Sequence, residues 1–63
     1  MRIALEITMD GEAFTNHNGH EAGRILRDLA VDRLMPNALE VGDSFTMMDY
    51  NGKKVGRAVV FEN

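Results

Sequence analysis

Apolar side chains recur every three or four residues between Asn18 and Leu34, which is the spacing of one face of an α-helix. Asn18 is a suitable N-cap, because its side-chain oxygen can accept from the free N–H groups of the first turn, and Glu21 fits the acidic position of a capping box. Pro36 disfavours helical geometry at Met35 and so ends the segment. The sequence therefore predicts one helix over 18–34. Its apolar face consists of Ala22, Ile25, Leu26, Leu29, Ala30 and Leu34.

Apolar and polar residues alternate in segment 2–9, which is the pattern of a half-buried strand. Two further strand-like segments, 44–49 and 53–61, flank Asn51-Gly52, a residue pair typical of hairpin turns. The order of elements is then strand, helix, strand, strand. We expect a single α+β domain over 1–63, in which a three-stranded antiparallel sheet has its first strand beside its last and the helix packs on one face.

The length of the hairpin loop decides which side chains face the helix, because a slip of one residue turns a strand over. A two-residue loop on Asn51-Gly52 would pair Phe45 with Ala58. A three-residue loop, 50–52, would pair Phe45 with Arg57 and suits a type I turn with Gly52 in a left-handed bulge. We predict the three-residue loop. The helix face of the hairpin then carries Phe45, Met47, Val55, Val59 and Phe61, with Arg57 as its one charged residue.

Two surfaces are candidates for binding a protein partner. The first is the charged face of the helix, where Arg24 and Asp28 are four residues apart and can form an ion pair. The second is the sheet face away from the helix, which would be partly apolar; a solvated face is the alternative interpretation. A chain this short has a small core, so a homodimer at micromolar concentration is a further expectation. The expected partner-binding residues are Glu21, Arg24, Asp28, Asp32, Met48 and Val60.

Composition narrows the classes of function. Ten acidic and seven basic residues give a net charge of -3, whereas nucleic-acid binders usually have a basic face. The absence of cysteine excludes disulfides and thiolate metal sites. The sequence shows no signal peptide and no apolar run long enough to cross a bilayer, so we expect a cytoplasmic protein with no membrane partner.

Residues able to carry chemistry are few. His17 and His20 share one loop, but a metal needs three or four ligands in fixed geometry, so we expect no metal and no cofactor. A pH-sensing role for this loop is an alternative. Ser44 has no elbow motif around it and is far along the chain from both histidines. We therefore predict no enzyme activity and no catalytic residue.

The hairpin supplies an alternative function. Lys53, Lys54 and Arg57 cluster there beside Tyr50, and a basic β-ribbon can enter a nucleic-acid groove. Lysines also commonly protect exposed strand edges, which is the simpler interpretation. A small nucleic-acid-binding regulator using Tyr50, Lys53, Lys54 and Arg57 is therefore the second hypothesis.

Three stretches of the chain carry a resemblance. They are Met9-Asp10 followed by Ala13-Phe14, then the helical stretch 21–30, EAGRILRDLA, and the hairpin stretch 49–56, DYNGKKVG. Together they resemble small proteins encoded by bacteriophages and other mobile elements, in which a first strand, one helix and an Asn-Gly hairpin make up the whole protein. Small acidic phage proteins of this size often block host machinery, including CRISPR effector complexes. The resemblance thus implies a protein-binding, anti-CRISPR-like inhibitor or modulator of a bacterial complex, acting in the host cytoplasm.

Overall fold

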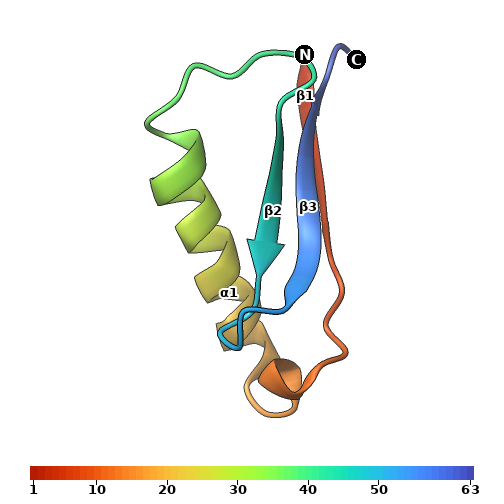
Figure 1. Ribbon diagram of the computed structural model, residues 1–63, viewed down its shortest axis with the longest axis vertical. Coiled ribbons are helices and arrows are strands. Elements are labelled where there is room, and N and C mark those ends of the chain that lie inside the picture. The colour runs from red at the N-terminus through yellow and green to blue at the C-terminus, as the bar shows by residue number, and fades with distance from the viewer.

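The computed structural model describes all residues, 1–63. Its three strands form one antiparallel sheet in the order β1-β3-β2, and one helical segment packs against it (Figure 1). The predicted α+β fold, with the first strand beside the last, is therefore confirmed. The elements are β1 (Arg2–Ile7), a 3-10 turn η1 (Glu12–Phe14), α1 (Asn18–Asp28), a π-helical segment η2 (Leu29–Leu34), β2 (Ser44–Met48) and β3 (Lys54–Phe61).

The helical segment has the predicted bounds but a different N-terminus. The N-cap is His17, which has a left-handed backbone (φ 53°, ψ 44°) and makes no side-chain capping bond. The predicted capping box between Asn18 and Glu21 is thus wrong, because the Glu21 side chain bonds elsewhere. At the other end the helix widens, and the Met35 N–H donates to the Ala30 carbonyl five residues back at 2.9 Å.

The hairpin has the predicted three-residue loop. Gly52 has φ 81°, and its N–H donates to the Asp49 carbonyl at 2.9 Å. The Asp49 N–H in turn donates to the Lys53 carbonyl at 2.9 Å, which closes the strand pair around the turn. Both bonds fit a type I turn followed by a left-handed glycine.

The register beyond this turn differs from the prediction. Met48 pairs with Lys54, whereas Met47 pairs with Gly56, so Val55 is the extra residue of a β-bulge. Phe45 consequently pairs with Ala58 and not with Arg57.

Beyond the bulge at Val55, the residues of β3 face the side opposite to the one predicted. Ala58 and Val60, 0% and 2% exposed, are buried, whereas Phe61 is exposed. The prediction that Val60 lies on the open face is therefore wrong, as is the prediction that Phe61 lies in the core. The physical reason is charge: the extra residue moves Arg57 to the solvated face while Val55 and Met47 stay buried.

The core lies between the helical segment and the part of the sheet formed by β2 and β3, and η1 closes one end of it. β1 is less covered. Ile3 and Leu5 belong to the same sheet face as Val60 and Ala58, their partners across the strand pair, yet remain 41% and 44% exposed. The buried residues of the core are Ala13, Phe14, Ile25, Leu29, Met47, Val55 and Ala58.

Candidate functional site: a groove between the helix and β2

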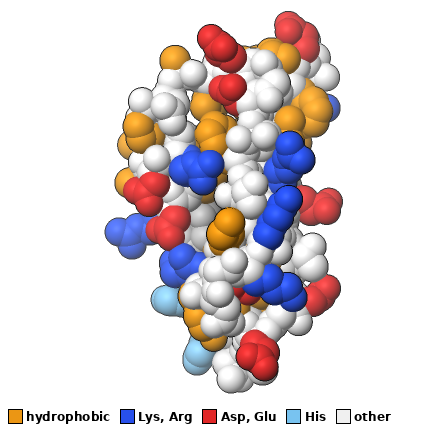
Figure 2. Space-filling model, viewed as in Figure 1, with side chains coloured by type: hydrophobic (Ala, Val, Ile, Leu, Met, Phe, Trp, Pro, Cys, Tyr) orange, Lys and Arg blue, Asp and Glu red, His pale blue; other side chains and the backbone are white.

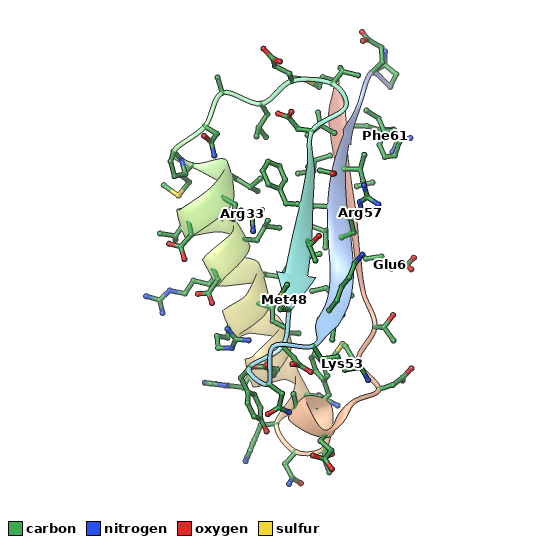
Figure 3. The ribbon with its side chains drawn as sticks, in the orientation of Figure 1. Glu6, Arg33, Met48, Lys53, Arg57 and Phe61 are labelled. Carbon is green, nitrogen blue, oxygen red and sulfur yellow. The ribbon has the colours of Figure 1, made fainter.

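An open groove of about 760 Å³ lies between the helical segment and the edge strand β2. Figure 3 shows Arg33 and Met48 on its two sides. Four of the six predicted partner-binding residues, Arg24, Asp28, Asp32 and Met48, line this one groove. The fold therefore brings together residues that the sequence assigned to two separate surfaces. The other lining residues are Ile25, Leu29, Arg33, Thr46, Met47, Asp49, Tyr50 and Gly52.

Arg24 organises one end of the groove. Its Nε and Nη2 donate to the two carboxylate oxygens of Glu21 at 2.7 and 3.0 Å, and its Nη1 donates to Asp28 Oδ2 at 2.9 Å. The predicted pair between Arg24 and Asp28 is thus confirmed. Nη2 also reaches the backbone carbonyl of Met48 at 3.4 Å, so one guanidinium links the helix to β2. These bonds to carboxylates raise the pKa of Arg24, so its positive charge is fixed at this position.

Glu21 is a buried residue that supports one end of the groove through its bonds to Arg24 and the hairpin turn. Its side chain is buried, so the prediction that it belongs to the exposed helix face is wrong. The cause is its partners: besides Arg24, its Oε2 accepts from the Tyr50 N–H at 2.8 Å. The bonds from Arg24 lower the pKa of Glu21, against an opposing effect of burial, and the Tyr50 N–H lowers it further. A charged Glu21 therefore holds the hairpin turn against the start of the helix.

Asp49 shapes the hairpin turn beside the groove. Its buried Oδ1 accepts from the backbone N–H groups of Asn51 and Lys53, both at 2.9 Å. This Asx arrangement fixes the loop and leaves the Tyr50 side chain 65% exposed at the groove.

The outer edge of β2 carries free backbone groups. The Val60 N–H donates to the Asp43 carbonyl, so backbone groups of odd-numbered residues point toward β3 along this strand. Groups of even-numbered residues then point outward, in agreement with the Met48 carbonyl that faces Arg24. The N–H and C=O groups of Ser44 and Thr46 therefore lie on the free edge, and Thr46 also lines the groove.

Two residues that line the groove, Arg33 and Thr46, are not among the site residues predicted from the sequence. Arg33 lies over the Phe45 ring, with its guanidinium carbon 5.3 Å from the ring centroid, and so forms part of the groove wall. Thr46 lines the groove from the edge strand β2. No local pattern points to Arg33 or Thr46, because their place in the groove depends on where the helix lies over the sheet.

The basic residues of the alternative hypothesis lie on and beside the hairpin. Figure 2 shows Lys and Arg side chains over the sheet, and Figure 3 places Arg57 on β3 and Lys53 beside the hairpin, just before β3 begins. Arg57 donates to Ser44 Oγ at 3.2 Å on the open sheet face and lies opposite Glu6 of β1 in the strand register. Tyr50 lines the groove, whereas Lys53, Lys54 and Arg57 are not among the residues that line it.

Neither a metal-binding cluster of side chains nor a membrane-spanning helix is present in the structure. His17 and His20 are both exposed, and no group of three or more His, Cys, Asp or Glu side chains is placed to hold a metal ion. None of the helices has the length and apolar character needed to span a membrane. Comparison of the chain with protein-family models, with curated proteins and with solved structures gave no match.

Proposed function

We propose that this protein is a non-enzymatic module that binds a protein partner in the groove between the helix and β2. The observation that carries the proposal is the meeting of an unpaired strand edge, an apolar floor and charged walls in one groove. Ile25, Leu29 and Met47 form the floor, and Arg24 and Asp32 belong to the helical wall. A groove of this composition supports recognition of a polypeptide, since backbone, apolar and charged groups all find partners there.

The mode of binding that fits this geometry is addition of an extended segment to β2. Backbone groups of Ser44 and Thr46 would bond the segment, and alternate side chains would enter the groove. Arg24, Asp28 and Asp32 carry charges of both signs, which favours specificity and encounter rate more than raw affinity.

The class of partner is proposed from the resemblance to small phage-encoded proteins. A bacterial complex, including a CRISPR effector complex, is the partner that this resemblance supports. The groove is then the contact surface of an inhibitor or modulator that acts by occupying its target.

The test compares two substitutions of matched exposure. Met48 lies in the groove and Val31 lies outside it, and each side chain is 52% exposed. Tagged wild-type protein, Met48→Asp and Val31→Asp are each used to capture partners from a bacterial lysate, with circular dichroism as the folding control. We expect one specific partner that Met48→Asp loses and Val31→Asp retains. Equal retention by both variants, with both folded, would exclude the groove.

Nucleic-acid binding is the second candidate, supported by the cluster of Lys53, Lys54 and Arg57 at and along β3. It is distinguished by salt, because phosphate contacts release counterions and affinity then falls steeply with ionic strength. Replacing Lys53 and Lys54 with glutamine should abolish such binding while leaving capture of a protein partner through the groove intact.

A further inference from the structure

The second free edge of the sheet belongs to β1. The Thr8 N–H donates to the Val55 carbonyl at 2.8 Å, so even-numbered residues of β1 bond to β3. The N–H and C=O groups of Ile3, Leu5 and Ile7 therefore point away from the sheet. β1 contains neither proline nor lysine, the residues that commonly block strand addition at an edge.

This edge is also apolar on one face. Ile3 and Leu5 are more than two-fifths exposed, although their neighbours Val60 and Ala58 are buried. Leu26 is also exposed, and it points away from Arg24 because the two residues lie two positions apart on the helix. The sheet face that packs on the helix is therefore left partly exposed at β1, on the side of the helix opposite the groove.

We propose that a second copy of this chain pairs with β1 edge to edge, antiparallel, with Ile3 of each copy opposite Leu5 of the other. Only odd-numbered residues carry outward backbone groups, so each must face an odd-numbered residue of the second copy. Two registers near the middle of β1 satisfy this condition: Ile3 opposite Leu5, or Leu5 opposite Leu5.

Charge selects between these registers. When Ile3 faces Leu5, Arg2 of each copy lies opposite Glu6 of the other, and Ala4 faces Ala4 on the symmetry axis. These are non-hydrogen-bonded positions, where side chains approach most closely. When Leu5 faces Leu5, Arg2 faces Thr8 and Glu6 faces Ala4, so neither residue faces an opposite charge of the second copy. β1 is therefore complementary to itself in one register.

The resulting dimer has one sheet that continues through both copies. Because the symmetry axis of an antiparallel strand pair is perpendicular to the sheet, both helices lie on the same face. Ile3 and Leu5 of the two copies then meet between the helices and leave water together. The β2 grooves lie at the two outer edges and stay open, so this interface is independent of the proposed partner site.

The test exchanges the two charges. Sedimentation equilibrium is measured for the wild type, Arg2→Glu, Glu6→Arg and an equimolar mixture of the two variants. Each single substitution places like charges opposite each other twice, and we expect the dimer dissociation constant to rise about ten-fold or more. In the mixture every substituted position faces an opposite charge, so dimers of one copy of each variant should return. Both side chains are exposed, but Glu6→Arg also places an arginine opposite Arg57 and Arg2→Glu removes the contact of Arg2 with the Phe61 ring. Circular dichroism therefore checks that each variant is folded, and recovery in the mixture separates the effect on the dimer from these effects within the chain.

Amide hydrogen exchange gives a second readout that needs no variant. The amides of Ala4 and Glu6 bond to β3 and should be protected at all concentrations. Those of Ile3 and Leu5 should become protected only as the dimer forms. The proposal is overturned if the wild type stays at the 7.0 kDa of one chain at hundreds of micromolar. It is equally overturned if a dimer forms without protecting Ile3 and Leu5, or if mixing folded variants restores nothing.

Discussion

The carboxylate of Glu21 on the helix accepts a hydrogen bond from the backbone N–H of Tyr50 in the hairpin at 2.8 Å. The same carboxylate accepts hydrogen bonds from Nε and Nη2 of Arg24. One buried charge therefore fixes the hairpin turn relative to the helix, and with it the shape of one end of the groove.

The stability of the fold should consequently depend on the charge of Glu21. Its pKa is lowered in the folded state, so its contribution is fully present above the unfolded-state pKa, about 4.3. The contribution is lost as the pH falls through the lower folded-state pKa. Glu21→Gln should lower the melting temperature at neutral pH, and its difference from the wild type should shrink as the pH falls below about 4. Thermal unfolding followed by circular dichroism across pH measures this. Glu62→Gln, at an exposed residue, is the control, and an equal effect of both substitutions would contradict the prediction.

Three glycines should respond differently to alanine. Gly23 lies within the helix with open space around it, so Gly23→Ala should stabilise the protein by up to about 1 kcal/mol. Gly52 also has open space but a φ of 81°, so Gly52→Ala should cost about 1 kcal/mol. A side chain at Gly56 would collide with the backbone oxygen of Glu6, so Gly56→Ala should cost about 2 kcal/mol or more. Urea denaturation ranks the three variants, and a Gly56→Ala protein as stable as the wild type would refute the bulge at Val55.

The free edge of β2 can be tested with proline. Thr46→Pro removes an N–H that points away from β3, so the protein should stay folded and lose affinity for its partner. Phe45→Pro removes an N–H on the side that pairs with Ala58 and should unfold the protein. Circular dichroism and partner affinity are measured for both variants. A folded Thr46→Pro variant with full affinity would show that the partner does not add a strand to β2.

The charged and apolar parts of the groove should differ in their response to salt. Asp32→Lys should change partner affinity mainly at low ionic strength, because exposed charges are screened. Met48→Asp should weaken binding at all salt concentrations, since it removes apolar area worth about 25 cal/mol per Å². Isothermal titration at low and high salt compares the two. Arg24 is unsuitable for this comparison because its bonds to Glu21 also support the fold.

The sequence predicts the elements well and the site only in part. The helix over 18–34 and the turn at Gly52 are local features, encoded by periodicity and by a glycine with a left-handed backbone. The face of β3 is a tertiary choice: the register without a bulge leaves Arg57 on the helix face. Gly56, inside a strand pattern beside that misplaced charge, is the signal that could have indicated a bulge.

The groove itself depends on information that no single segment contains. Arg24, Asp28, Asp32 and Met48 could be selected as accessible side chains, but their convergence follows from the position of the helix beside β2. The prediction that Val60 is exposed is wrong for the same reason as the predicted register of β3. The prediction that Glu21 is exposed is wrong because a buried carboxylate that accepts several hydrogen bonds has the same sequence pattern as a solvated one.

The strand order also has a consequence for synthesis on the ribosome. β3 is the central strand and follows β1 and β2 in the chain, so neither has its neighbour until residues 54–61 have emerged. Arg2 pairs with Phe61, which makes the sheet a set of long-range contacts that form late. A nascent chain that stops short of Lys54 carries a helix and two unpaired strands, with the apolar side chains of β1 open to aggregation or to chaperones. Folding of this chain is therefore a step that follows translation of β3.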